Sequence, residues 1–434
     1  MASSELHINW YRFRLLFFIL AVCHVFLVFF KSHIFGYNLS YDAVKYLHVA
    51  NEFLGRAPLD YQYNCNTSPG YPLFLAPLIF LFPDSVMAVM IAQVLIFSFS
   101  LYVMMSTLIS KKFLTTSQAV IASAMVMLSL DFITYNGYVL TESLTASLLM
   151  LIVSLLLKDR DEKINMWLLS FLPVALIAVR TEYIILFPAF LLAVYLNRFT
   201  WKRILLPVVL LSFMLTANGI RNMNIYGKFS FFGFGGSQVT YGGNNLNGDG
   251  SWHYYATTPD YLPEHGEREM MAIDMIGDEC IACPKRDSLF KVLVREAIRE
   301  NGVSNLSLVP VKLAKMWTLP GEIDPYTSDS TFSPAIIPEH YFKSSESVVS
   351  NIMSNKYIIY HWLFLGLSLA GLVIRWWKYK AHYFDFTAMA IVVAVSMAYA
   401  VLFYGLPRFH IPLLPFVLVY TAFLIGMVPF SVRK

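Results

Sequence analysis

Acidic and basic residues recur in this chain at the ends of hydrophobic segments. Asp42 follows the first such segment, and Glu142 begins a later one. Three arginines, Arg180, Arg221 and Arg408, lie at other segment ends. A carboxylate beside a membrane span is costly to keep ionised, so its presence favours a functional role. Together these residue types suit chemistry on an anionic group at a membrane surface.

The chemistry that fits best is transfer from a lipid phosphate. Arginines hold phosphate by charge-assisted, often bidentate hydrogen bonds. Asp42 would accept the proton of an attacking hydroxyl, as a general base does. The arginines, or a cation held by Glu142, would stabilise the departing phosphate. The pattern leaves open whether a divalent cation takes part, with Asp42 and Glu142 as its ligands if it does.

Each of these residues also has a purely structural explanation. Interfacial arginines often reach towards lipid headgroups. Arg180 and Glu182 could pair within one turn, and Asp42 and Glu142 could each complement a helix dipole. What these explanations do not cover is the gathering of acids and arginines from five separate places on one predicted membrane face.

The composition requires a membrane. The chain has 434 residues, of which 57% are hydrophobic and only 14% are charged. A soluble domain of this length could not hide so much apolar surface. The net charge of +4, with no basic stripe among aromatic residues, argues against a nucleic-acid partner. The first segment lacks a small-residue cleavage site and is interpreted as a retained span.

Charge placement predicts the topology. Hydrophobic segments occur at 15–30, 70–82, 86–109, 117–133, 141–157, 165–180, 183–197, 203–220, 357–374, 385–405 and 410–429. The segment 70–82 is shorter than the roughly 20 residues needed to cross. If it stays on the outer surface, the loops rich in lysine and arginine all become cytoplasmic. The sequence therefore predicts an all-α polytopic membrane protein with about ten transmembrane helices and both termini inside.

This topology divides the chain into three parts. Residues 1–220 form a transmembrane module whose first outer loop (31–84) carries Asp42. Residues 221–356 form a small mixed outer domain, and residues 357–434 form the last transmembrane helices. In the outer domain, the Gly- and Asn-rich stretch 227–252 predicts turns and short strands. Residues 287–317 have helical spacing, with a break at Asn301-Gly302.

The cysteines predict an oxidising compartment. Of the four cysteines, Cys23 lies in the first span, whereas Cys65, Cys280 and Cys283 lie in predicted outer segments. Cys280 and Cys283 form a C-x-x-C pattern without a second pair, which supports zinc only weakly. We therefore favour a local disulfide between them.

Several short motifs resemble the GT-C integral-membrane glycosyltransferases, nearest to the branch of aminoarabinose transferases and protein O-mannosyltransferases. These motifs are Asp42 with Tyr46 and Ala50, SPGYPLFLAPL (68–78), LTESL (140–144), VRTEYIILFP (179–188), RNMNIYGKF (221–229) and PRFHIPLLP (407–415). The chain departs from the family in having no second acid beside Asp42. It also has Thr67-Ser68 where some relatives have a lysine, so Lys45 and Arg56 become the nearby phosphate contacts.

The resemblance implies a GT-C fold and an activity. A single sugar would pass, with inversion, from a polyprenyl-phosphate donor to a hydroxyl of lipid A or lipopolysaccharide, a glycan or a protein. The site would face the periplasm of a bacterial inner membrane. The donor-phosphate residues would be Arg221, Arg408, Arg180, Lys45 and Arg56. The sugar and acceptor pocket would comprise Tyr46, Tyr71, Glu182, Tyr241, Asn244 and Asn245.

Two other classes of protein share some of these features. A transporter or flippase of lipid-linked sugars would place its charges nearer the membrane midplane, in broken and repeated spans. An O-antigen polymerase or ligase would share the large outer loop and the arginines, but would depend less on an acid in the first loop. Neither the sugar nor the acceptor can be read from the residues.

Overall fold

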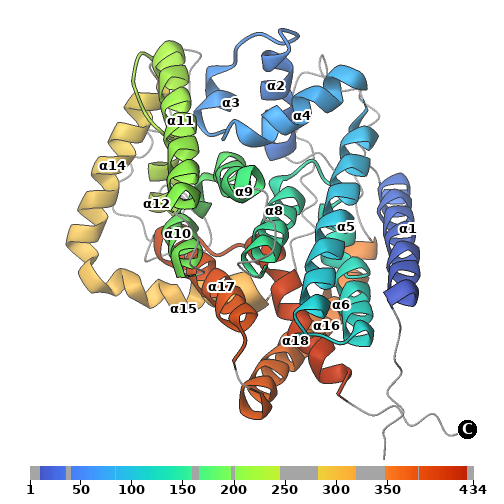
Figure 1. Ribbon diagram of the computed structural model, residues 1–434. Coiled ribbons are helices and arrows are strands. Elements are labelled where there is room, and N and C mark those ends of the chain that lie inside the picture. The colour runs from blue at the N-terminus through green and yellow to red at the C-terminus, as the bar shows by residue number, and fades with distance from the viewer. Residues whose placement is uncertain are drawn as a thin grey trace, which may run out of the picture.

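The computed structural model describes residues 10–35, 41–83, 85–158, 166–196, 201–244, 282–318, 348–379 and 381–427. Within these ranges the chain is helical and contains no strand (Figure 1). The elements are α1 (Trp10–Phe35), α2 (Tyr41–Phe53), α3 (Tyr61–Cys65), α4 (Gly70–Leu81), α5 (Val86–Ser110), α6 (Thr116–Met127), α7 (Leu130–Tyr135), α8 (Thr141–Leu156), α9 (Met166–Val179), η1 (Thr181–Leu186), α10 (Phe187–Leu196), α11 (Trp201–Tyr226), α12 (Gly236–Gly243), α14 (Ala282–Asn301), η3 (Gly302–Ser307), α15 (Leu308–Thr318), α16 (Val348–Lys378), α17 (Tyr383–Leu402), η5 (Pro407–Leu413) and α18 (Leu414–Ile425).

The protein is a multi-pass membrane protein by the length and hydropathy of its helices. Every hydrophobic segment found in the sequence is helical over most of its length. Among the described residues, six helices are long and apolar enough to cross a bilayer: Trp10–His33, Val86–Ser110, Ile204–Tyr226, Ile359–Lys378, Tyr383–Leu402 and Pro407–Ile425. The shorter apolar helices are Gly70–Leu81, Thr116–Met127, Thr141–Leu156, Trp167–Val179 and Thr181–Leu196.

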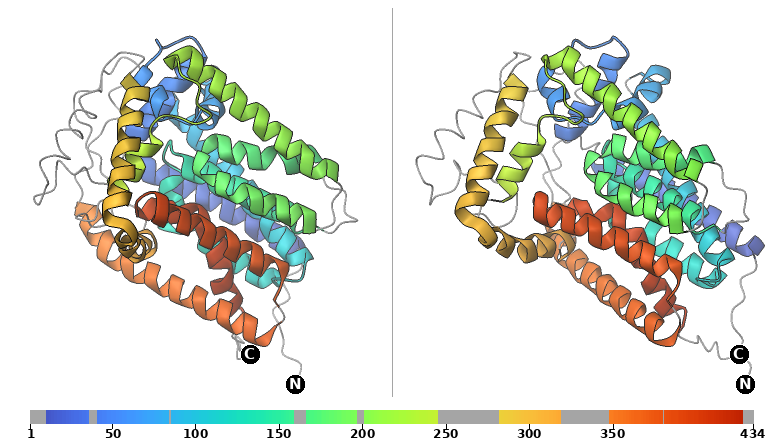
Figure 2. Two further views of the ribbon diagram at one scale, coloured as in Figure 1. Left: turned by 90° about the vertical axis from the view of Figure 1, so that its left-hand side faces the viewer. Right: turned by 60° about the vertical axis from the view of Figure 1, so that its left-hand side comes forward.

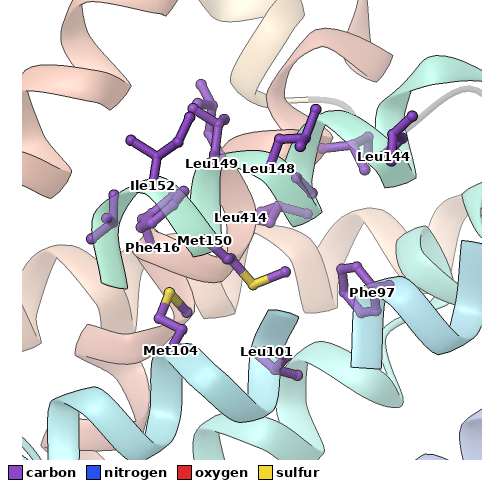
Figure 3. Packing of buried hydrophobic residues seen from close by; sticks show 14 of the residues in the cluster. Phe97, Leu101, Met104, Leu144, Leu148, Leu149, Met150, Ile152, Leu414 and Phe416 are labelled. Atoms are coloured by element: carbon purple, nitrogen blue, oxygen red, sulfur yellow. The ribbon is translucent and has the colours of Figure 1, made fainter. Parts of the chain in front are cut away.

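Helix α8 lies at the centre of the bundle, and almost all of its residues are buried. It packs against α5, and apolar side chains of α5, α8 and α18 fill the space between these helices (Figure 3). Because the surrounding lipid is as apolar as the core, close packing stabilises such an interior more than water exclusion does. The small polar residues Thr145, Ser147 and Ser154 satisfy their hydroxyls on carbonyls one turn earlier. The burial of α8 carries its first-turn acid, Glu142, into the interior.

The first predicted outer loop folds as three helices at one end of the bundle (Figure 1). Helix α2 packs against α4, and α4 contacts the end of α9. Gly70 permits this second contact, since a Cβ atom there would overlap the backbone of Ala178 and Val179. The chain continues from Val179 into Arg180, so the fit of α4 against α9 also places that arginine.

Helices α12, α14 and α15 lie along one side of the bundle (Figure 2). Helix α14 ends at Asn301, and Gly302 follows with a φ of 53°, as the Asn-Gly break predicted. The prediction of turns and short strands is wrong for Gly236–Gly243, which forms α12, whereas 245–252 lies outside the described residues. Glycines here serve close packing, because a Cβ on Gly235 would meet the Asn66 side chain and one on Gly243 the Phe403 carbonyl.

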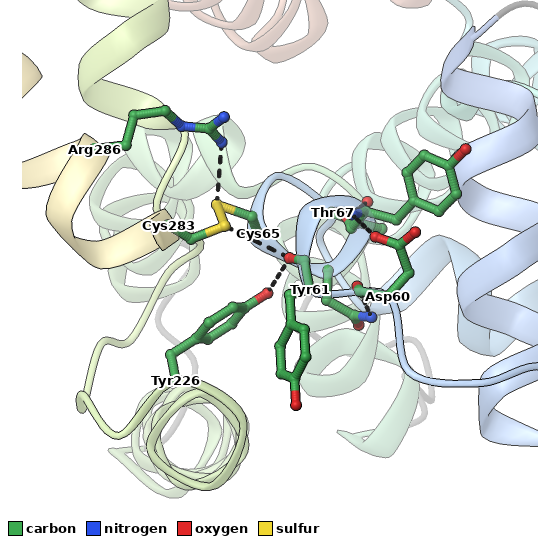
Figure 4. The surroundings of a disulfide bond; sticks show 9 residues. Asp60, Tyr61, Cys65, Thr67, Tyr226, Cys283 and Arg286 are labelled. Atoms are coloured by element: carbon green, nitrogen blue, oxygen red, sulfur yellow. Dashed lines mark hydrogen bonds between the residues drawn. A yellow bond between two sulfur atoms is a disulfide. The ribbon is translucent and has the colours of Figure 1, made fainter. Parts of the chain in front are cut away.

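A disulfide joins α3 to α14. Cys65, at the end of α3, is bonded to Cys283 across 218 positions of sequence, with a Cα–Cα distance of 6.0 Å (Figure 4). The favoured local pair of Cys280 and Cys283 is therefore wrong, and Cys280 itself lies outside the described residues. Beside the disulfide, the Tyr226 hydroxyl donates to the Tyr61 carbonyl at 2.8 Å, which also holds α11 against α3.

Candidate functional site

Five charged residues, which we call the ion-pair cluster, meet where several helices begin or end. They are Asp42, Lys45, Glu142, Arg180 and Arg408. Arg408 Nη2 lies 3.0 Å from Asp42 Oδ2, and Arg408 Nε lies 3.8 Å from Glu142 Oε1. Arg180 Nη2 donates to Glu142 Oε1 at 2.9 Å, and Lys45 Nζ donates to Asp42 Oδ1 at 2.9 Å. One guanidinium thus lies between two carboxylates.

Each member of the cluster is held by a local feature of its element. Asp42 and Lys45 lie one turn apart at the start of α2, and Glu142 is in the first turn of α8. Arg180 is the extended residue between α9 and η1. Arg408 is in the first turn of η5. Four separate places in the chain therefore contribute to one site, each at the end of an element.

Burial and charge together determine the state of Asp42. Burial alone would raise the pKa of its carboxyl, but Lys45 and Arg408 lower that pKa below its ordinary value of 3.8. The carboxyl is therefore ionised at neutral pH. The neighbouring Tyr46 has its pKa raised, first by burial and then by Asp42, so its phenol stays protonated.

The cluster contains polar atoms that no group in the described part of the chain satisfies. Glu142 Oε2, Arg180 Nη1 and Arg408 Nε are buried without a hydrogen-bond partner among the described residues. Glu142 is 1% exposed and Arg180 is 8% exposed. Buried donors of this kind are rare in folded proteins and call for an explanation. Two unused guanidinium N–H groups close to each other suit an anionic ligand.

An aromatic pair supports the two arginines. The Phe409 ring stacks on that of Tyr399, with centroids 4.0 Å apart. The Arg180 and Arg408 guanidinium carbons lie 5.7 Å and 5.8 Å from the Phe409 ring. The Tyr399 hydroxyl donates to Glu182 Oε1 at 2.7 Å. Neither aromatic residue was predicted as part of the site, although Phe409 directly follows Arg408 in the chain.

Two expected phosphate ligands lie outside the cluster. Arg221 donates to Asn64 Oδ1 and lies over the Phe53 ring at 5.9 Å. Arg56 Nη1 donates to the Ile79 carbonyl at 3.1 Å, near the end of α4. Arg221 is thus held by a side-chain amide of α3, and Arg56 by a backbone carbonyl near the end of α4. The role expected for Arg221 in binding the donor phosphate stays a prediction.

The expected pocket residues separate into two groups. The Tyr46 ring meets the Tyr71 ring edge-on at 5.0 Å, beside the cluster, and Glu182 Oε1 lies 3.7 Å from Arg180 Nε. The Tyr71 hydroxyl is engaged by Gln93 at 2.6 Å. Tyr241 is instead buried against Phe290, with ring centroids 5.6 Å apart.

Asn244 belongs to a lysine contact that the sequence did not predict. Lys312 Nζ donates to Asn244 Oδ1 and to the Phe403 carbonyl, each at 2.8 Å. Burial lowers the Lys312 pKa to about 8. The contact ties α12 and α15 to the residue just after α17, from which the chain leads to Arg408. Asn245 lies outside the described residues.

The two expected metal ligands do not form a ready metal site. Arg408 contacts both Asp42 and Glu142, so a divalent cation shared by these carboxylates would have to displace it. The geometry instead uses the guanidinium as the cation between the two acids.

No family model matches the sequence, and no curated protein matches it. The structure is similar to that of the apo oligosaccharyltransferase of Archaeoglobus fulgidus, at 10% identity and a TM-score of 0.49, covering 96% of this chain and 50% of that one. This chain therefore spans half the length of the archaeal enzyme. ArnT from Cupriavidus metallidurans, in a structure bound to undecaprenyl phosphate, is similar at 14% identity and a TM-score of 0.39. The match covers 94% of this chain and 76% of ArnT. The apo structure of the same ArnT is similar at 13% identity and a TM-score of 0.34, with the same coverage of both chains. The three similarities extend over 94 to 96% of this chain.

Proposed function

We propose that the protein is an inverting glycosyltransferase that moves a single sugar from a polyprenyl-phosphate donor to an acceptor hydroxyl. The observation that carries this proposal is the position of Arg408, between Asp42 and Glu142 at the end of an apolar helical bundle. A site of this kind offers a base and a cationic anion holder side by side. The bilayer supplies the lipid substrate.

The unsatisfied guanidinium atoms support a phosphate position. Arg180 Nη1 and Arg408 Nε are buried without hydrogen-bond partners among the described residues, and a phosphodiester would supply acceptors for both. Lys45 adds a third positive charge. The apolar helix α4 would lie along the polyprenyl chain, because Leu73 and Phe80 on it are exposed.

The reaction balances with these groups alone. The acceptor oxygen forms a bond to the anomeric carbon on the face opposite the phosphate, which inverts its configuration. The bond from that carbon to the phosphate oxygen breaks, and its electron pair leaves with polyprenyl phosphate. Asp42 takes the hydroxyl proton. Arg180 and Arg408 stabilise the charge that develops on the phosphate.

Arg408 links donor binding to the base. While it pairs with Asp42, it holds the carboxyl pKa below its ordinary value. A donor phosphate would share the same guanidinium, weaken that pair and raise the Asp42 pKa. Asp42 would then be the stronger base when donor is present, which suits a reaction in which the donor binds first.

The topology and location are part of the proposal. The six long helices and four of the shorter ones would make the ten spans, with α4 left at the membrane surface. The parts 1–220, 221–356 and 357–434 would be the transmembrane module, the outer domain and the last spans. The Cys65–Cys283 disulfide supports an oxidising compartment for the face that carries Asp42, which is the periplasm of a bacterial inner membrane.

Reconstitution with a labelled polyprenyl-phosphate sugar tests the function. We expect label to appear on a lipid, glycan or protein hydroxyl, together with release of polyprenyl phosphate. A protein that moves the labelled lipid across the bilayer without cleaving it would be a flippase, and that result would refute the proposal. Linkage of whole preassembled glycans to the acceptor would instead identify a polymerase or ligase.

A further inference from the structure

A second group of ligand-type side chains lies apart from the ion-pair cluster. Asp131 of α7, His361 of α16 and His410 of η5 each offer one donor atom, and these three atoms all lie within 4.8 Å of one another. All three side chains are buried, at 5%, 4% and 0% exposure. We propose that these residues bind one divalent transition metal ion, with zinc as the best match.

The hydrogen bonds of the two histidines prepare them as metal ligands. His410 Nδ1 donates to the Met316 carbonyl at 2.6 Å, and His361 Nε2 donates to the Trp317 carbonyl at 2.9 Å. A carbonyl can only accept, so each ring must carry its proton on that nitrogen. The lone pair is then on His410 Nε2 and on His361 Nδ1. Metal-binding histidines characteristically use their second nitrogen in this way.

His410 supplies the independent observation that a ligand is needed. Its Nε2 atom is buried and has no hydrogen-bond partner among the described residues, although the ring is fully buried. A buried nitrogen lone pair with nothing to accept is costly. Nε2 is also the unprotonated nitrogen, because the ring proton is on Nδ1, which donates to the Met316 carbonyl. A metal ion at this position would satisfy it.

The donor set selects the class of metal. Two imidazole nitrogens and a carboxylate oxygen suit zinc and similar divalent ions, with bond lengths of about 2.0 to 2.2 Å. Calcium and magnesium prefer six or more oxygen ligands, which this group does not offer. Small movements of the side chains would draw the donors from their present separation to the span of one ion, and a water molecule could complete the coordination.

The position of the group gives the metal a structural consequence. Its ligands come from α7, α16 and η5, and the carbonyls that orient the histidines come from consecutive residues of α15. His410 lies two residues after Arg408 in η5. A bound ion would therefore anchor the element that carries Arg408, whether or not the protein transfers a sugar.

Metal analysis of the full chain tests the site. The protein would be purified through a tag without histidines, stripped with a chelator, exposed to zinc and freed of excess by gel filtration. We expect about one zinc per chain in the wild type, and less than about a tenth of that in His410→Ala, His361→Ala and Asp131→Asn. Wild-type protein that retains no zinc, or variants that retain as much as the wild type, would overturn the proposal.

His24→Ala is a matched control. His24 is also fully buried, but its two ring nitrogens are engaged by the Met127 carbonyl and by Asn136. This variant should keep about one zinc per chain, because it removes a buried imidazole without removing a predicted ligand.

An X-ray absorption spectrum at the zinc edge needs only the wild type and covers the case in which a variant fails to fold. Scattering from two imidazoles with no sulfur is expected. Sulfur ligands would place the zinc on cysteines and refute the assignment.

Discussion

Arg408 donates to Asp42 at 3.0 Å, although 366 positions separate the two residues in the chain. The pair joins α2, which follows α1, to η5, which leads into the last helix α18. Both side chains are 23% exposed, so a ligand can reach the pair. The same guanidinium lies 3.8 Å from Glu142, which makes it the centre of the proposed site.

Replacing Asp42 by Asn should lower the rate of sugar transfer by roughly 100- to 10,000-fold, the usual contribution of a general base. Donor affinity should be retained or rise, because the amide keeps the shape of the side chain and no longer competes with the donor phosphate for Arg408. Single-turnover transfer and donor binding would be measured on the same preparation. Transfer at the wild-type rate would remove Asp42 as the base.

Asp385→Asn is the control for loss of a buried acid. Asp385 pairs with Arg375 at 3.2 Å and accepts from the Tyr420 hydroxyl at 3.0 Å, away from the ion-pair cluster. Both variants remove a carboxylate paired with an arginine, so both can destabilise the fold. Only the Asp42 variant should lower the rate per folded molecule.

Arg408→Ala should weaken binding of polyprenyl phosphate by about 10- to 100-fold, which corresponds to the loss of charge-assisted hydrogen bonds. Arg221→Ala should change that affinity by less than about threefold, because its guanidinium is held by Asn64 instead. Titration with the lipid phosphate in nanodiscs would measure both. A larger loss of affinity in the Arg221 variant than in the Arg408 variant would show that Arg221 is the main phosphate ligand.

His48 should make the segment that contains α2 more stable at acidic than at alkaline pH. Its hydrogen bond to Glu52 raises its pKa above 6.5, and the side chains lie 3.2 Å apart. A raised histidine pKa gives stability that is fully present below 6.5 and is lost as the pH rises through the raised value. His48→Gln should remove this part of the pH dependence in thermal unfolding. An unchanged pH profile in the variant would contradict the assigned pair.

Gly70→Ala should lower the free energy of unfolding by about 1 to 3 kcal/mol, because its Cβ would push α4 away from α9. It should also reduce transfer, since Arg180 follows the contacted backbone. Gly366→Ala is the matched helical control, with no atom within 4 Å of the added Cβ. Thermal unfolding of the two variants in one detergent would compare them. Equal melting temperatures would show that the α4–α9 contact is not tight.

Loss of the Cys65–Cys283 bond should destabilise the protein by about 2 to 4 kcal/mol, because this bond closes a long loop and so restricts the unfolded chain. Non-reducing peptide mapping should find Cys65 linked to Cys283, and Cys65→Ser should abolish that link. A peptide with Cys280 linked to Cys283 would instead support the local pairing.

Several features of the fold could be predicted from the sequence because they are local. A hydrophobic run predicts a helix wherever it lies in the bundle. The break at Asn301-Gly302 depends only on the freedom of glycine to adopt a positive φ. Asp42, Glu142, Arg180 and Arg408 were found in the same way, because a charge at the end of such a run is costly. The pattern does not specify partners, so it did not predict that Arg221 donates to Asn64.

Pairing across long separations was decided by the tertiary structure. In the sequence, Lys312 is an ordinary lysine of an amphipathic helix. In the structure, its amine donates to Asn244 and to the Phe403 carbonyl. His361 and His410 are ordinary residues of hydrophobic segments until two carbonyls of α15 orient their rings. The sequence alone determined a helical membrane protein with charges at its helix ends. The rotation and packing of those helices determined which charges, cysteines and histidines meet, because a side chain's direction depends on neighbours hundreds of residues away.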